Sequence, residues 1–339
     1  FSHAAGVPLD TVLQQPAAAT EGGAAGDRGE WCGEHDDDLA RAGEERLRAC
    51  GLWRRLRSYQ QEGVRRGLKM GGCFLLADDM GLGKTLTALA TVVALDAWPC
   101  LAIVPAVTRR GWAAEVETFL TGVLSPSDIH VCYDQFDALT ETRPVPKLVL
   151  ISPKMADRTH QHRNLLSRQW GCAILDEAHV LATAAVRQDC DQTRALMELL
   201  RSVPRRLLLT GTPATAKLYD AFNVFDVLRP GLLAKNKYEY RHRFFEQSTG
   251  ACKLSRQLPL LVHKFLMVRR TKAQVMDALP ERLDAHVDVP IHGKTARDVL
   301  ARFGADDAMR TAAAGTSASA ASGADADSLR IAGLKSTAH

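Results

Sequence analysis

The alternation of short apolar runs with longer amphipathic stretches is the feature that most limits how this 339-residue chain can fold. Apolar runs of four or five residues are typical of strands buried on both faces, and amphipathic runs are typical of covering helices. The pattern predicts an α/β fold with a mainly parallel sheet and ligands at the carboxyl ends of its strands. The expected strands are Cys73–Ala77, Cys100–Val104, Lys147–Ile151, Cys172–Leu175 and Arg206–Leu209, and the expected helices are Lys84–Ala97, Thr108–Leu120, Gln161–Gln169, Asp191–Arg201 and Lys217–Leu228.

Composition excludes several classes of protein. No run reaches the eighteen apolar residues of a membrane span, so we expect a soluble chain with no membrane partner. The eight cysteines form no Cys-x-x-Cys pair, so we expect reduced thiols and no structural zinc. Residues 1–50 hold ten acidic and four Lys or Arg residues, which leaves 39 basic against 29 acidic in the remainder. That excess is compatible with a polyanionic partner and equally with simple solubility.

The turn after the first expected strand has the pattern of a phosphate-binding loop. It reads Asp78-Asp79-Met80-Gly81-Leu82-Gly83-Lys84-Thr85 and leads into an expected helix. Backbone N–H groups at such a helix start can surround a triphosphate, Lys84 can reach its β and γ phosphates, and the Thr85 hydroxyl can bind Mg²⁺. The strict pattern has Gly where this chain has Asp78, so an ordinary helix cap with a surface lysine stays an alternative.

A second candidate site lies 92 residues beyond Lys84, where Asp176-Glu177-Ala178-His179 follows an apolar strand. Asp176 is placed to hold Mg²⁺, and Glu177 is placed to orient and deprotonate an attacking water. His179 is placed to sense the γ-phosphate. A strand end capped by acidic surface residues is the alternative explanation.

Two further segments complete the set. Thr210-Gly211-Thr212 brings small hydroxyl residues to the end of another strand and could couple nucleotide state to movement, although a plain strand and turn would look the same. Upstream, the amide of Gln60 could contact the adenine edge.

In this order the motifs resemble those of the Swi/Snf-type, superfamily-two helicase-like ATPases, together with Ile103-Val104-Pro105 and the later Phe265-Leu266-Met267-Val268-Arg269-Arg270-Thr271-Lys272. Trp98-Pro99 and Leu124-Ser125-Pro126 are most similar to the annealing helicases of the HARP (SMARCA-like) and ZRANB groups. After Pro213 the chain reads Ala214-Thr215 where the wider family often has Gln-Asn, a departure shared with that branch.

The resemblance implies a RecA-like three-layer sandwich that binds ATP with Mg²⁺. It implies that Lys84, Asp176 and Glu177 are catalytic and that the enzyme moves on duplex, forked or branched DNA in the nucleus. Single-strand-binding or replication proteins are expected partners. A nucleosome-remodelling ATPase of the same family and a truncated, non-catalytic binding module remain alternatives.

The resemblance also gives an expected domain plan. Because the second lobe of this family is not expected within the chain, which starts at Phe1 and reads as a fragment, we expect weak nucleotide binding and poor hydrolysis. The expected segments are a flexible, partly acidic stretch at 1–50, the ATP-binding lobe at 51–230, a helical extension at 231–290, a low-complexity linker at 291–327, and the start of a second lobe at 328–339. The N-terminal and near-C-terminal segments are expected to be disordered.

DNA contacts of this family are made mostly to phosphates and are independent of sequence. The resemblance places them at Pro105, Ala106, Arg109 and Arg110, with Trp112 nearby. A solvated helix start with Trp112 packed into the core is the alternative for these side chains.

Overall fold

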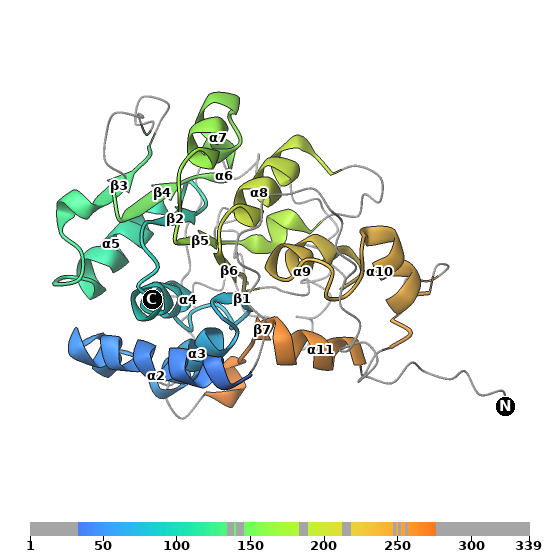
Figure 1. Cartoon of the computed structure of the whole chain (residues 1–339), viewed down its shortest axis with the longest axis horizontal. Helices are drawn as coiled ribbons and strands as arrows, with labels where there is room; N and C mark the ends of the chain where they lie inside the picture. Colours follow the sequence, from blue (N-terminus) through green and yellow to red (C-terminus); the bar gives the residue numbers. More distant parts are fainter. Residues whose placement is uncertain are drawn as a thin grey trace, which may run out of the picture. The chain divides into compact units, whose positions relative to one another are not determined.

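The fold is built around one sheet of seven parallel strands. The computed structural model describes residues 33–133, 139, 146–182, 189–211, 218–246, 249, 252–254 and 257–275. The strands lie in the order β3-β4-β2-β5-β6-β1-β7 (Figure 1). Their bounds are β1 Cys73–Leu76, β2 Cys100–Ile103, β3 Ile129–Val131, β4 Leu148–Ile151, β5 Cys172–Leu175, β6 Arg205–Leu209 and β7 Met267–Val268. The predicted parallel α/β sandwich is therefore confirmed.

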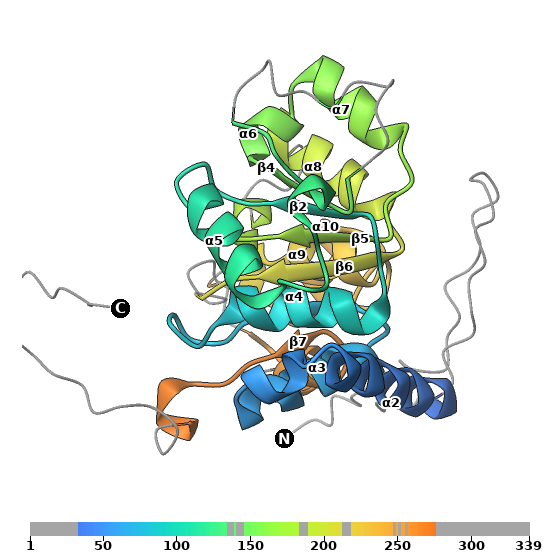
Figure 2. The same cartoon turned by 90° about the vertical axis from the view of Figure 1, so that its left-hand side faces the viewer.

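Helices cover both faces of the sheet, which gives three layers (Figures 1 and 2). Alternate strand residues point to opposite faces, so Leu75 and Leu101 belong to one apolar core and Phe74 and Leu76 to the other. The first core is closed by helices that follow β4 along the chain, and the second by helices near the start. The helices are α2 Gly33–Ala49, α3 Ser58–Lys69, α4 Lys84–Leu95, α5 Arg109–Phe119, α6 Pro153–Ala156, α7 Thr159–Leu166, α8 Asp191–Arg201, α9 Phe222–Leu228, α10 Lys237–Phe244 and α11 Gln257–Phe265.

The register of the strands brings their carboxyl ends to one edge. Leu76 is paired with Leu209, Leu175 with Leu208, and Ile103 with both Leu175 and Ile151. The segments that follow β1, β2, β4, β5 and β6 therefore start at nearly the same level, as expected of a ligand-binding edge.

The expectation that residues 1–50 form a flexible segment is wrong for residues 33–49. These residues form α2, which packs beside α3 and α4 and buries Ala40 and Leu47. The Arg46 guanidinium donates to Ala94 O at 2.5 Å. Acidic residues dominate this segment, but it also has a narrow apolar stripe along one side. That stripe is enough to stabilise a helix when it packs against the surfaces of α3 and α4.

The range 231–290, expected to be a helical extension, contains α10 and α11 and also returns to the sheet as β7. Tyr240, Phe244 and Phe245 pack together there, with ring centroids of Tyr240 5.4 and 5.5 Å from the two Phe rings. The other expected segments, 1–32, 291–327 and 328–339, lie outside the described residues. Among the described helices, none combines the length and apolar character of a membrane span.

Candidate nucleotide-binding site

The predicted phosphate loop connects β1 directly to α4. Gly81 and Gly83 have φ values of 81° and 70°, a left-handed conformation that is strained for residues with a Cβ. Gly83 is the residue that precedes the first turn of α4, so Lys84 and Thr85 open the helix. The N–H groups of this turn have no partner within the helix and are available to an anion.

Lys84 lies half-buried among backbone carbonyls and carboxylates. Its Nζ donates to Asp78 O at 3.0 Å and to Asp79 O at 3.4 Å. Burial lowers the pKa of the ammonium, and the negative charges of Asp78, Asp176 and Glu177 oppose that shift. A phosphate placed here would meet a cation that the protein leaves incompletely solvated, which strengthens the attraction.

Asp176 is held by donors on both of its oxygens. Its Oδ2 accepts the indole N–H of Trp112 at 3.0 Å, and its Oδ1 accepts the backbone N–H of Glu177 at 2.9 Å. Burial raises the pKa of Asp176, while these two hydrogen bonds act in the opposite direction. Trp112 is 3% exposed and lies on α5, so the indole both packs in the core and orients a carboxylate of the site.

Glu177 lies beside Asp176 in an unusual backbone conformation. Its φ of 54° is left-handed, which is rare for a residue with a long side chain and often marks functional sites. Its carboxylate contacts His179, with Oε2 3.1 Å from Nδ1, and both side chains are nearly half exposed. This carboxylate is thus free to meet solvent, whereas that of Asp176 is partly buried and hydrogen-bonded on both oxygens.

The segment after β6 meets the phosphate loop. A Cβ on Gly211 would lie 2.8 Å from the Met80 side chain and 3.4 Å from Lys84 Nζ, so a larger residue here would require Met80 to move. Thr210 is buried, and its N–H donates to Leu76 O at 3.1 Å. Thr212, predicted with them, lies outside the described residues.

Gln60 contacts the loop rather than open space. Its Nε2 lies 3.3 Å from Leu82 O and 3.4 Å from Gly83 O, and its Oε1 accepts the Arg57 N–H at 2.9 Å. The side chain is 4% exposed. In this arrangement Gln60 supports the second half of the loop, and contact with adenine stays a prediction.

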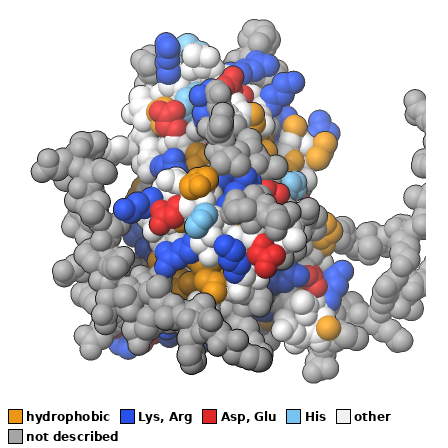
Figure 3. Space-filling model, turned by 90° about the vertical axis from the view of Figure 1, so that its right-hand side faces the viewer, with side chains coloured by type: hydrophobic (Ala, Val, Ile, Leu, Met, Phe, Trp, Pro, Cys, Tyr) orange, Lys and Arg blue, Asp and Glu red, His pale blue; other side chains and the backbone are white. Residues whose placement is uncertain are grey.

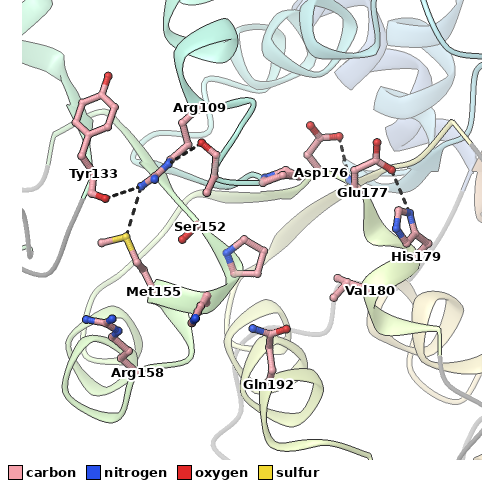
Figure 4. A pocket seen from close by; sticks show the side chains of 14 residues that line it. Arg109, Tyr133, Ser152, Met155, Arg158, Asp176, Glu177, His179, Val180 and Gln192 are labelled. Atoms are coloured by element: carbon pink, nitrogen blue, oxygen red, sulfur yellow. Dashed lines mark hydrogen bonds and ion pairs between the residues drawn. The ribbon is translucent and has the colours of Figure 1, made fainter. Parts of the chain in front are cut away.

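A cavity of about 760 Å³ extends from the carboxylates across the ends of β2 and β4. Figure 4 shows Asp176, Glu177 and His179 at one side of it and Arg109, Tyr133 and Met155 at the other. Pro105 and Ala106 also line it, as do the exposed side chains of Lys154 and Arg158. The last two were missed from the sequence, although a polar segment directly after the β4 run was a usable signal.

The two predicted DNA-binding arginines differ in their surroundings. Arg109 is 9% exposed, and its guanidinium donates to Cys132 O and to Tyr133 O, the latter at 3.2 Å. It therefore supports the segment after β3 while one side faces the cavity. Arg110 is exposed. Basic and acidic side chains are interspersed on the face toward α10 (Figure 3), so net charge alone locates no polyanion site there.

The sheet, the glycine loop with Lys84, and the paired carboxylates at the same edge define a RecA-like, P-loop type of nucleotide-binding lobe. The chain belongs to the SNF2-related family, since the model of the SNF2-related domain matches residues 59–319. It is thus an ATPase domain of the SNF2 type.

Comparison with individual proteins agrees with this assignment. The chain is 27% identical to the human DNA annealing helicase and endonuclease ZRANB3 over 271 residues, which cover 76% of this chain and 24% of that protein. It is 29% identical over 239 residues to the Caenorhabditis elegans homolog of SWI/SNF-related matrix-associated actin-dependent regulator of chromatin subfamily A-like protein 1, covering 68% and 33%. The chain thus spans about a quarter to a third of these relatives.

A solved structure shares the fold. The Sulfolobus solfataricus SWI2/SNF2 ATPase core in complex with dsDNA superposes with a TM-score of 0.53 at 26% identity, covering 65% of this chain and 45% of that one.

Proposed function

We propose that this chain binds Mg-ATP between the phosphate loop and the carboxylates, and that it serves an enzyme that moves on duplex or forked DNA and anneals separated strands. The convergence of Lys84, Asp176 and Gly211 at one edge of the sheet carries the nucleotide part of this proposal. The DNA part is supported by the cavity with its basic rim and by relatives described as annealing helicases. We also propose a nuclear location and single-strand-binding or replication proteins as partners, as the resemblance of the motifs to the annealing helicases implies.

The donor set of the site suits Mg²⁺. Within the described residues no cluster of three His, Cys, Asp or Glu side chains could hold a metal ion alone. Mg²⁺ commonly uses one or two protein oxygens with phosphates and water, and Asp176 with the Thr85 hydroxyl provides that number. When bound, the ion would neutralise charge on the phosphate oxygens.

The side chains then have separate tasks. Lys84 binds the phosphates, the partly buried Asp176 would hold the ion, and Glu177 accepts the proton of the attacking water. The contact between Glu177 and His179 gives the carboxylate a defined orientation and links it to the cavity, which His179 also lines. A group bound at the DNA side of the cavity can therefore affect the position of Glu177, the proposed general base.

Trp112→Phe is expected to raise the Mg²⁺ concentration needed for half-maximal ATP binding about tenfold, because partners of a metal ligand set its orientation. Phenylalanine keeps an aromatic ring in the core but removes the N–H that Asp176 accepts. Titration of a fluorescent ATP analogue at several Mg²⁺ concentrations measures the effect. Trp170→Phe is the matched control, since the Trp170 indole is buried and donates to Leu165 O at 2.9 Å. Equal Mg²⁺ requirements in the two variants would contradict the role of Trp112.

The DNA part is tested at the rim of the cavity. Replacing Lys154 and Arg158 by alanine is expected to weaken duplex binding and to reduce the slope of log affinity against log salt by up to about 1.8, since each phosphate contact contributes about 0.9. Removing Arg65 and Lys69 from α3, on the other face of the sheet, takes away the same charge and is expected to leave the slope nearly unchanged.

Preference for forks is measured by competition between a forked and a linear duplex of the same sequence and length. Tighter binding of the fork supports the annealing-helicase assignment. Equal binding would leave a general duplex-binding ATPase domain, such as that of a nucleosome remodeller, as the better description. Loss of all DNA binding at low salt would remove the DNA part of the proposal.

A further inference from the structure

We propose that the segment Arg269–Lys272, directly after β7, is a latch that holds the phosphate loop in shape, and that Arg270 is its main positioning residue. This inference rests on the proposed nucleotide binding, because it assigns a role to residues that support the same loop. It concerns a segment that lies nearly two hundred residues from the loop in the sequence.

The backbone of the latch runs beside β1 and continues past its end. Leu75 N donates to Leu266 O at 2.7 Å, Ala77 N to Val268 O at 2.7 Å, and Asp79 N to Arg270 O at 3.0 Å. The strand pairing therefore extends two residues into the loop, as far as Asp79. The first half of the loop is held as if it were part of the sheet.

A buried ion pair fixes the same half of the loop. Asp78 is fully buried, and its Oδ1 accepts both the backbone N–H and the Nε–H of Arg270 at 2.9 Å. A second guanidinium nitrogen of Arg270 contacts Oδ2. Two parallel contacts of this kind define direction as well as distance, and a buried carboxylate that lost them would be left uncompensated.

The Asp78 pair explains the departure of this loop from the strict P-loop pattern. Glycine stands at that position in the strict pattern, but here the side chain anchors the loop. The backbone carbonyls of Asp78 and Asp79 accept hydrogen bonds from the Lys84 ammonium. The ion pair between Asp78 and Arg270 therefore also sets the position of the groups that orient Lys84.

Helix α3 provides the space that the latch requires. A Cβ on Gly63 would lie 2.5 Å from a guanidinium nitrogen of Arg270, so a larger residue would displace it. One turn earlier, the Tyr59 ring centroid lies 5.5 Å from Arg270 Cζ. Gln60 on the same helix contacts Leu82 O and Gly83 O. The loop is thus held at its start by Arg270 and at its end by Gln60.

Asp79 gives the latch a second, more exposed anchor. Its Oδ2 accepts Lys272 N at 2.9 Å, and its Oδ1 lies 3.6 Å from the Arg269 guanidinium. The Lys272 side chain passes close to Gly81, at 3.8 Å from the position of a Cβ there. Both acidic residues of the loop therefore face the latch.

Hydrogen exchange of the 339-residue chain tests the latch without any nucleotide. In Arg270→Gln, amides of residues 79–84 are expected to exchange about tenfold or more faster than in the native chain, because the contacts that close the loop are lost. Arg270→Lys keeps the charge but not the paired contacts, so its exchange rates at these amides are expected to lie between those of the native chain and those of Arg270→Gln.

Arg241→Gln is the matched control, since Arg241 is another buried arginine paired with an aspartate, Asp220, at 3.0 Å. The proposed role of the latch is wrong if hydrogen exchange of the loop amides is no faster in Arg270→Gln than in this control. Should Arg270→Gln fail to fold, Asp79→Ala at the exposed anchor gives the same comparison, with about threefold faster loop exchange expected.

The affinity for Mg-ATP, measured on the same proteins, separates the two proposals. Weakened binding in Arg270→Gln with normal binding in Arg241→Gln supports both. Unchanged loop exchange beside normal nucleotide binding would overturn the latch alone. Absence of nucleotide binding in the native chain would overturn the proposed function, while the exchange data would still decide on the latch.

Discussion

Lys84→Met is expected to weaken Mg-ATP binding by about 10²–10⁴-fold, because two charge-assisted hydrogen bonds to phosphate contribute about 1.5–3 kcal/mol each. Methionine has nearly the length of lysine but carries no charge. Equilibrium titration with a fluorescent ATP analogue measures the loss.

The same substitution is expected to have a small effect on stability. Burial lowers the pKa of Lys84, so the free protein disfavours the charged form, and an apolar side chain of similar length removes that cost. We expect the melting temperature to stay within about 3 °C, the shift produced by roughly 1 kcal/mol in a chain of this size. Lys69→Met on the surface of α3 is the control for nucleotide binding. Normal ATP affinity in Lys84→Met would show that the loop does not bind phosphate through this residue.

The central strands and several of the helices between them could be predicted from the sequence because local pattern and final environment agree. The expected helix Asp191–Arg201 is α8, residue for residue. The expected strand Cys172–Leu175 is β5, which is buried along its whole length. In such segments the spacing of the apolar residues alone indicates which side chains will be buried, whatever the segment packs against.

Elements that depend on distant partners were missed or mistaken. β7 has only two residues, and it is a strand because it pairs with β1, which lies about 190 residues away in the chain. α2 reads as acidic and flexible, yet it is ordered by the surfaces of α3 and α4. In both cases tertiary packing, rather than local preference, determines the structure.

The candidate site divides in the same way. The loop with Lys84 and the Asp176-Glu177 pair are local patterns, and the structure brings them together. The residues that orient them act across long separations: Trp112 lies 64 residues from Asp176, and Arg270 lies 192 residues from Asp78. Nothing near a carboxylate in the sequence indicates which donor will reach it, so these supports emerge only from the fold.

Glu177→Gln is expected to lower single-turnover ATP hydrolysis by about 10²–10⁴-fold, the usual contribution of a general base, while ATP affinity changes by less than about threefold. Glutamine keeps the size of the side chain and can still meet His179, but it cannot accept the proton of the attacking water. With protein in excess over labelled ATP, a slow single turnover remains measurable, so the assay does not require rapid cycling.

The chain offers a close control for this substitution. Glu198 on α8 also pairs with a histidine, with Oε2 3.2 Å from His162 Nε2, but it lies on an exposed surface and outside the cavity. Glu198→Gln should hydrolyse ATP like the native chain. If Glu177→Gln did the same, the base would have to be another group. If instead it lost ATP binding, the carboxylate would be needed to build the site, and the separation of binding by Lys84 and Asp176 from proton transfer by Glu177 would be wrong.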